Sequence, residues 1–163
     1  MNNGLSDTLI ASFPDTITAP RPLVVDQEIK DPFWLAGFVE GDGCFRVRSS
    51  NSSSHKSSVS LVFKITQHIR DVALMGSFVK YFDCGSVYND SKDAVVFRVI
   101  TFSDIHEKII PLFQKFPLKG VKALDYADFC KVVELMQTKA HLTAKGLEQI
   151  RKIKAGMNTG RII

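Results

Sequence analysis

From Asp31 onward, segments in which hydrophobic residues recur with the period of a helix are followed by segments in which they recur with the period of a strand. Asp31 is a favoured N-cap and Pro32 a favoured first helical residue, so a helix is predicted from there to Gly43. Alternation of apolar and polar residues over 44–50 and 59–68 predicts two strands joined by a serine-rich segment. These strands are expected to form a hairpin with a long polar tip.

The same succession follows a second time along the chain. A helical period returns over 71–82, and strands at 86–89 and 94–101 predict a second hairpin. Ser103 is then predicted to cap a helix that reaches about Lys115.

Two further helices are predicted at about 121–138 and at 144–155, the second with Thr143 as its cap. The order of elements predicts an α+β fold of the type αββαββα, with a four-stranded antiparallel sheet and helices on one face. Residues 1–30 contain prolines and no sustained period, which predicts an extended arm or a linker. Residues 31–163 are expected to form a single domain.

Strand alternation assigns each side chain of this sheet to one of its two faces. The face away from the helices is predicted to carry Arg46, Arg48, Ser50, Lys64, Thr66, His68, Tyr88 and Arg98. Arg, Lys, Ser and Thr supply the donors and acceptors that base edges and phosphates need, so this open face is a candidate DNA-reading surface. An ordinary solvated face is the alternative that the pattern leaves open.

Charge supports a nucleic-acid partner through its distribution more than through its total. The chain has 21 Lys and Arg against 17 Asp and Glu, a formal charge of +4, which permits DNA binding without requiring it. No acidic residue occurs from Gly43 to Arg70, whereas five basic residues do. Three widely spaced cysteines favour a reducing compartment, and the absence of a long apolar run predicts an intracellular protein without a membrane span.

Two glycines lie four residues apart in the first predicted helix, Gly37 and Gly41. A glycine inside a helix costs about 1 kcal/mol relative to alanine, and the close approach of a second backbone would offset that cost. Leu35 and Phe38 would add apolar contacts to such a pairing face. Close packing on the chain's own sheet is the alternative, because glycine spacing alone does not separate the two interpretations.

Asp42 falls at the C-terminal end of this helix, where the macrodipole disfavours a carboxylate. If two such helices met at a two-fold axis, both copies of Asp42 would favour hard divalent cations, with Mg²⁺ as the natural occupant. The exposed carbonyl of Gly41 would offer a further oxygen ligand. Without a second helix, Asp42 is a lone surface acid.

Residues 35–43, LAGFVEGDG, match in order the nine-residue signature of the LAGLIDADG homing endonucleases. The alternating helix and hairpin pattern from Asp31 onward also resembles one half-domain of that family, whose sheet is saddle-like. The segments 66–70, 120–122 and 154–158 are similar to other parts of such proteins.

The resemblance implies a role for each of several residues. Asp42 would be the metal-binding acid, the Gly41 carbonyl a metal ligand, Gln67 the group that positions the attacking water, and Lys122 the group that stabilises phosphate charge. Metal-assisted attack of water on a phosphodiester needs no nucleophilic side chain. Mg²⁺ is the implied cofactor, with Ca²⁺ as a non-cleaving substitute. Arg70 departs from the pattern, since it lies one residue nearer to Gln67 than in homodimeric members, and only DNA contact is assigned to it.

Members of this family have either one motif and dimerise, or two motifs and fold as pseudo-dimers. One motif here predicts a homodimer that cleaves a palindromic or near-palindromic double-stranded DNA site. Residues 10–22 resemble the link between the halves of a two-motif enzyme, so the other interpretation is that the chain is an isolated or engineered second, C-terminal half. An RNA-binding intron maturase and an inactive DNA-binding module are the alternative functions. The family resemblance implies a mitochondrial or other organellar location.

Overall fold

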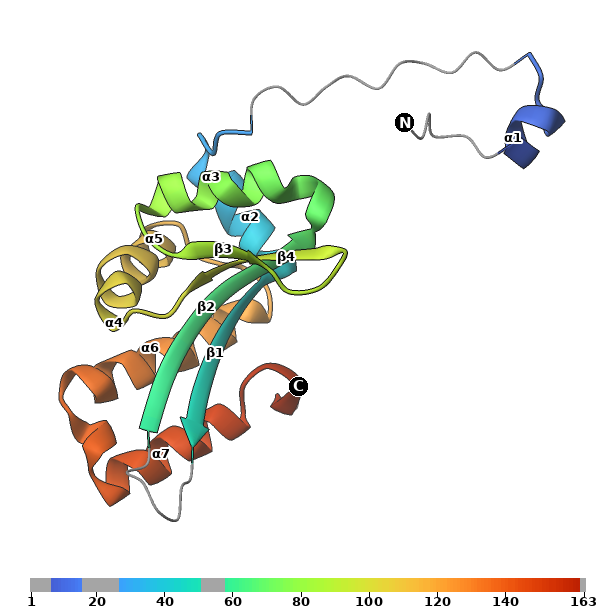
Figure 1. Ribbon diagram of the computed structural model, residues 1–163. Helices are drawn as coiled ribbons and strands as arrows, with labels where there is room; N and C mark the ends of the chain where they lie inside the picture. Colours follow the sequence, from blue (N-terminus) through green and yellow to red (C-terminus); the bar gives the residue numbers. More distant parts are fainter. Residues whose placement is uncertain (1–6, 16–26, 51–57, 162–163) are drawn as a thin grey trace.

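A computed structural model of the protein describes residues 7–15, 27–50 and 58–161. Its centre is one antiparallel sheet with the strand order β1-β2-β4-β3, which confirms the predicted fold class (Figure 1). The strands are β1 (Gly43–Ser50), β2 (Ser58–His68), β3 (Ser86–Asn89) and β4 (Ala94–Val99). The predicted polar tip of the first hairpin, residues 51–57, lies outside the described residues.

Helices connect and cover the strands in the predicted order (Figure 1). They are α1 (Asp7–Ser12), α2 (Pro32–Asp42), α3 (Val72–Phe82), α4 (Phe102–Asp104), a π-helical turn (Ile105–Ile109), α5 (Ile110–Lys115), α6 (Lys122–Gln137) and α7 (Ala144–Ala155). Short 3₁₀ turns follow at Ile69–Asp71, Ala140–Leu142 and Asn158–Gly160. The short helix α1 lies within residues 1–30, for which an extended arm or a linker was predicted.

The ends of α2 and α7 follow from local chemistry. The carboxylate of Asp31 accepts the N–H of Phe33 at 2.8 Å and so caps α2. This helix ends at Asp42 because the backbone of the next residue, Gly43, is extended (φ −78°, ψ 159°), and glycine is favoured there since a Cβ would lie 2.6 Å from Cγ1 of Val39. Thr143 caps α7 as predicted, since its hydroxyl oxygen accepts the N–H of Gly146 at 3.1 Å.

The predicted cap at Ser103 is wrong. Helix α4 begins two residues earlier than this cap implies, at Phe102, with Thr101 as its N-cap and no side-chain capping bond. Ser103 therefore lies inside the first turn. The preceding strand, β4, ends at Val99, so the chain reaches this helix sooner than the alternating pattern indicated.

An aromatic cluster fills the layer between the sheet and the helices. Phe45, at the start of β1, is fully buried, and its ring centroid lies 5.2 Å from that of Phe63, 5.6 Å from Phe113 and 5.4 Å from Phe129. Because β1 follows α2 directly, this buried ring fixes the backbone next to the end of α2. None of the helices in the described segments is long and apolar enough to cross a bilayer.

Candidate active site and nucleic-acid interface

Three elements that are distant in sequence meet at the C-terminal end of α2. Asp42 ends that helix, Gln67 lies near the end of β2, and Lys122 begins α6. Nε2 of Gln67 donates to Oδ2 of Asp42 at 2.8 Å, across 25 residues. Nζ of Lys122 donates to the carbonyl of Gly41 at 3.0 Å, across 81 residues. The structure therefore brings together the four residues to which the sequence assigned catalysis and metal binding.

Strand register explains how Gln67 reaches this place. Gly43 pairs with Ile65, so β2 continues past the first residue of β1 and runs beside the end of α2. Gln67 has the same parity as Ile65, and its side chain therefore leaves the sheet on the helix-covered face. That direction leads to Asp42.

The site offers both oxygen ligands and N–H donors to a bound group. Asp42 and Gly41 are exposed and provide one carboxylate and one carbonyl, while Gln67 and Lys122 contribute N–H donors. The described residues contain no group of three or more His, Cys, Asp and Glu side chains that could enclose a metal. Mg²⁺ is commonly held by one or two carboxylates, waters and substrate phosphates, so one acid and one carbonyl fit that ion.

A second acid of the motif, Glu40, also makes a defined contact. Its Oε2 accepts the backbone N–H of Lys119 at 3.0 Å, in the loop that leads to α6. Sequence analysis gave Glu40 no role. Two features of the sequence could have indicated this contact: an acid within the motif, and a glycine, Gly120, shortly before the candidate lysine.

The outer side of α2 carries the two glycines. A Cβ built at Gly37 or Gly41 would meet no heavy atom within 4 Å, so these glycines do not serve close packing on the chain's own sheet. Phe33 and Trp34 are 69% and 44% exposed on this helix. Sequence analysis did not assign these two aromatic residues to the face.

Leu35 does not belong to this outer face. It is fully buried in the core of the chain itself, so the prediction that it contacts a partner is wrong. Phe38 is half-buried, and its ring lies 5.0 Å from Trp34 and 5.6 Å from Phe78. Its contacts therefore connect the outer face of α2 to the core.

The open face of the sheet carries the predicted polar and basic side chains in register. Lys64 pairs with Cys44 on one side and Arg98 on the other, and Arg98 pairs with Ser86. The guanidinium of Arg98 lies 4.6 Å from the ring centre of Tyr88. By the same register, Arg46, Arg48, Ser50, Thr66 and His68 share this face, and no paired position on it carries an acid.

Two valines modify this description of the open face. Val62 lies opposite Arg46 and Val96 opposite Tyr88, and these valines are 2% and 0% exposed. The stems of long polar side chains commonly cover apolar residues in such positions, and Arg46 and Tyr88 are the register partners of these valines. The face thus has an apolar floor beneath polar tips.

Arg70 stands apart from the other predicted residues. Its side chain is 78% exposed and lies 3.7 Å from Asp71, and its backbone N–H donates to Nδ1 of His68 at 3.2 Å. The contacts described for Arg70 do not join it to Asp42, Gln67 or Lys122.

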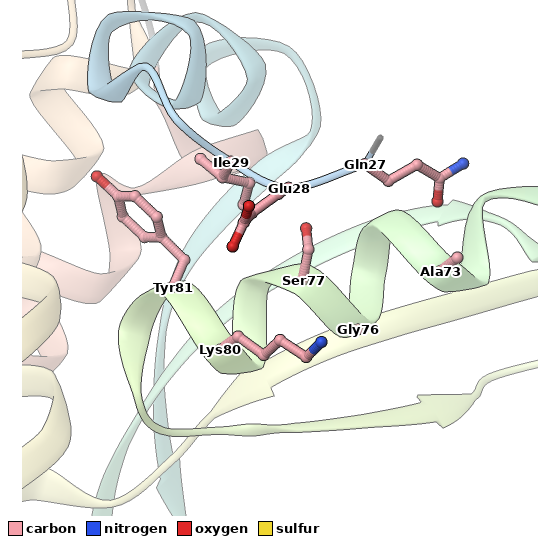
Figure 2. A pocket seen from close by; sticks show the side chains of 8 residues that line it. All are labelled: Gln27, Glu28, Ile29, Ala73, Gly76, Ser77, Lys80 and Tyr81. Atoms are coloured by element: carbon pink, nitrogen blue, oxygen red, sulfur yellow. The ribbon is translucent and has the colours of Figure 1, made fainter. Parts of the chain in front are cut away.

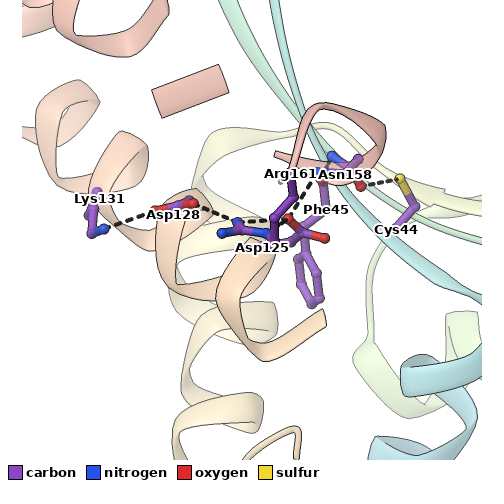
Figure 3. Close-up of polar contacts among 7 residues, drawn as sticks. All are labelled: Cys44, Phe45, Asp125, Asp128, Lys131, Asn158 and Arg161. Carbon is purple, nitrogen blue, oxygen red and sulfur yellow. Dashed lines mark hydrogen bonds and ion pairs between the residues drawn. The ribbon is translucent and has the colours of Figure 1, made fainter. Parts of the chain in front are cut away.

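A partly buried polar network holds the chain shortly after Asp42 (Figure 3). Asn158 donates from Nδ2 to the carbonyl of Phe45 at 3.0 Å, and the thiol of Cys44 donates to its Oδ1 at 3.6 Å. The backbone N–H of Asn158 donates in turn to Asp125 of α6 at 2.9 Å. These bonds connect the end of the chain, β1 and α6 on one side of the candidate site.

Arg161 closes this network on α6. Its Nη2 lies 2.9 Å from Oδ1 of Asp125 and 2.7 Å from Oδ2 of Asp128. Burial alone would raise the pKa of Asp128, but hydrogen bonds from Lys131 and Arg161 outweigh burial and hold that pKa below its usual range. The ion pairs that Asp128 makes with Lys131 and Arg161 therefore depend on its ionised carboxylate.

A cavity of about 620 Å³ lies elsewhere, between residues 27–29 and α3 (Figure 2). Ser77, on its wall, donates its hydroxyl to the carbonyl of Leu74 at 2.7 Å. None of the residues assigned to catalysis lines this cavity, so it carries no candidate chemistry.

Comparison with known proteins places this arrangement in a family. The model of the LAGLIDADG endonuclease family matches residues 35–133. "Probable intron-encoded endonuclease 3" of Neurospora crassa is 39% identical over 153 residues, which are 92% of this chain and 29% of that protein. "Probable intron-encoded endonuclease 2" of the same organism is 35% identical over 166 residues, 94% of this chain and 35% of its own length.

Solved structures agree with these sequence relatives. The LAGLIDADG homing endonuclease I-SmaMI bound to cleaved DNA superposes with a TM-score of 0.90 at 48% identity, covering 99% of this chain and 55% of that one. I-GzeII in complex with its DNA target gives 0.88 at 42% identity, with 99% and 55% coverage. The chain thus spans about a third of these curated relatives and just over half of the solved chains. On its motif, its fold and these likenesses, the chain belongs to the LAGLIDADG endonuclease family.

Proposed function

We propose that this chain is a half-site unit of a metal-dependent, site-specific double-strand DNA endonuclease that acts as a pair of LAGLIDADG domains. The observation that carries this proposal is the convergence of Asp42, Gln67, Lys122 and the Gly41 carbonyl at one exposed helix end. This end lies beside a sheet face without acids. An oxygen site next to a basic surface suits a phosphodiester substrate.

Each residue has a distinct task in this proposal. A divalent ion, with Mg²⁺ as the candidate and Ca²⁺ as a non-cleaving substitute, would supply Lewis-acid stabilisation of phosphate oxygens when bound to Asp42 and the Gly41 carbonyl. Gln67 orients the Asp42 carboxylate through its amide N–H, and its amide can also hold a water next to the substrate. Lys122 brings a positive charge to the place where phosphate charge develops. One relative supports the choice of metals, because I-SmaMI has been solved on uncleaved DNA in the presence of calcium ions.

Pairing through α2 supplies the second half of the site. Gly37 and Gly41 leave room for another backbone, and Phe33 and Trp34 provide exposed aromatic surface around them. A homodimer would place both copies of Asp42 near the two-fold axis and would require a palindromic or near-palindromic site. Because the solved relatives are longer, a second domain in the same polypeptide is the other way to form this pair.

DNA would lie on the open face of the sheet. Arg46, Arg48, Ser50, Lys64, Thr66, His68, Tyr88 and Arg98 are the proposed contacts, with Arg70 at the margin of this face. Antiparallel ribbons fit the major groove, and these side chains can address base edges and phosphates there. The names of several relatives refer to introns, including one of ND4 and one of cox1, and we extend to this chain the expectation of an organellar origin.

The decisive experiment is cleavage of a randomised palindromic DNA library by the purified protein with Mg²⁺. Asp42→Asn serves as the variant, since it keeps the size of the side chain and removes its charge, and Ca²⁺ serves as the metal control. We expect cleavage by the wild type with Mg²⁺ alone and none by Asp42→Asn. Cleavage by both proteins at equal rates would refute the nuclease mechanism, and cleavage by neither would refute pairing of the chain with itself. Binding of intron RNA without DNA cleavage would favour a maturase instead.

A further inference from the structure

The signature helix carries two acids, and they point to different parts of the molecule. Glu40 and Asp42 are two residues apart in α2, and an α-helix turns by about 200° over two residues, so their side chains leave it on nearly opposite sides. Asp42 contacts Gln67. Glu40 instead contacts the loop that leads to α6.

Both carboxylate oxygens of Glu40 lie close to the backbone of this loop. Oε2 of Glu40 accepts the backbone N–H of Lys119 at 3.0 Å. On the other side, a Cβ added to Gly120 would lie only 2.5 Å from Oε1. Glycine at position 120 therefore allows the loop backbone to lie directly against the half-buried carboxylate.

The start of α6 has no capping side chain of its own. Its N-cap is Val121, which makes no side-chain capping bond. The first turn of a helix has unpaired N–H groups and a partial positive charge, both of which attract a carboxylate. Glu40 provides such a carboxylate from a different helix, at the loop just before the cap.

Lys122 is the first residue of α6, so the position of this loop determines where its side chain begins. The ammonium group donates to the Gly41 carbonyl at 3.0 Å. Glu40 and Gly41 are neighbours in α2. Glu40 holds the backbone of the loop before Lys122, and the Gly41 carbonyl holds the tip of the Lys122 side chain. A lysine side chain is long and flexible, so its tip is well placed only when its backbone is also held.

We infer that Glu40 is a positioning residue for Lys122: it anchors the loop before α6 so that the lysine ammonium is held at the end of α2. This inference rests on the proposed function, in which Lys122 acts on the DNA phosphate. In this role Glu40 acts through the loop backbone at Lys119 and not on the substrate itself. A misplacement of about 1 Å in a reacting group can lower a rate about 100-fold, so Glu40→Ala should approach the loss caused by Lys122→Ala.

A double-mutant cycle tests this relation directly. Single-turnover cleavage with Mg²⁺ is measured for Glu40→Ala, Lys122→Ala and the double variant, and DNA affinity is measured separately with Ca²⁺. We expect each single variant to lose about 100-fold in rate with unchanged affinity, and the double variant to lose no more than Lys122→Ala alone. A purely structural role of Glu40 would add a further loss in the Lys122→Ala background, and that result would overturn the inference.

Two more variants approach the contact from the side chain and from the loop. Glu40→Gln keeps an oxygen that can accept the Lys119 N–H and should restore most of the rate that Glu40→Ala loses. Gly120→Ala should reproduce the loss, because its Cβ would displace the carboxylate. Gly156→Ala is the matched control, since a Cβ there meets only the Ile153 carbonyl, at an ordinary 3.6 Å. Equal rates for Glu40→Ala and Glu40→Gln would contradict the inference.

Amide hydrogen exchange gives a readout that does not require cleavage. In Glu40→Ala, the Lys119 amide should lose protection while amides in the middle of α6 keep theirs. Retained protection would overturn the inference even if activity fell. The two proposals fail separately: full activity of Asp42→Asn and Lys122→Ala refutes the nuclease mechanism, whereas their inactivity beside a fully active Glu40→Ala refutes only the role of Glu40.

Discussion

Replacement of Gly37 should change stability and pairing in opposite directions. A Cβ at Gly37 meets no atom within 4 Å, and Gly37 does not have the positive φ that would require glycine. Alanine is favoured over glycine in a helix interior by about 1 kcal/mol, partly through the unfolded chain. Gly37→Ala should therefore raise the free energy of unfolding by about 0.5–1 kcal/mol, which corresponds to about 1–4 °C in Tm for a chain of this size.

Pairing should suffer from a larger side chain at the same position. Leucine at 37 would project from the strip formed with Gly41, where a second helix backbone is expected to approach. Overpacking of a close interface costs about 1–3 kcal/mol, equivalent to about a 5- to 150-fold loss of association. Cleavage by Gly37→Leu should fall in parallel, because an unpaired domain has only half of the site.

Gly76 provides a matched control in α3. A Cβ there also meets nothing within 4 Å, and this glycine lies beside the cavity of Figure 2 and away from the outer face of α2. Gly76→Ala should stabilise the chain by a similar amount, and Gly76→Leu should leave pairing unchanged. Denaturant unfolding followed by circular dichroism measures the first effect, and sedimentation velocity with and without DNA measures the second.

Two results would refute this reasoning. A loss of stability in Gly37→Ala would show that the outer face of α2 is packed within the single chain. Unchanged association and cleavage in Gly37→Leu would show that partners do not meet through this strip. A loss of pairing in Gly76→Leu as well would indicate a general effect of added leucine instead of a specific interface.

Three further predictions concern the fold and the DNA face. Tyr126→Phe should lower the free energy of unfolding by about 1 kcal/mol in a denaturant titration, because it removes the 2.8 Å hydrogen bond to the Ile110 carbonyl; no change would contradict this. The pKa of Asp128 is lowered in the folded chain, so its ionised form contributes stability above its unfolded pKa of about 3.9, and this contribution is lost as pH falls through the folded value. Asp128→Asn should thus flatten the acid side of the stability profile, and an unchanged profile would argue against the ion pair. Arg98→Lys keeps the charge but loses the planar fork over Tyr88, so base preference should relax while the salt dependence of binding stays the same; binding to base-substituted sites checks this, and an unaltered preference would remove Arg98 from base reading.

Much of the fold follows from local pattern. The strand alternation, the caps at Asp31 and Thr143 and the break at Gly43 all agree with the structure, because each depends on chemistry within a few residues. The predicted cap at Ser103 is wrong because this residue, although of a favoured capping type, lies two positions after Thr101, which is the N-cap of α4 without a capping bond. Local preference cannot detect such a shift when tertiary packing sets the start of the helix.

The residues of the site also differ in whether local sequence or only tertiary contact reveals them. Asp42 could be found in the motif itself, and Gln67 and Lys122 through family resemblance, but periodicity does not predict bonds that span 25 and 81 residues. Glu40 was missed for this reason. Its partner is the backbone N–H of Lys119. Every residue other than proline has such a group, so no side-chain pattern marks Lys119 as the donor to Glu40.

The apolar residues of α2, including the wrongly assigned Leu35, indicate that this helix has a partner. A helix that is apolar on all sides is normally buried on all sides, and α2 presents Phe33, Trp34, Leu35, Phe38 and Val39 around its circumference. Its periodicity therefore could not show which side meets the chain's own sheet. The structure shows Leu35 and Val39 fully buried while Phe33 is 69% exposed. One domain thus covers only one side of this helix, and the uncovered side is the one with room for a second backbone at Gly37 and Gly41.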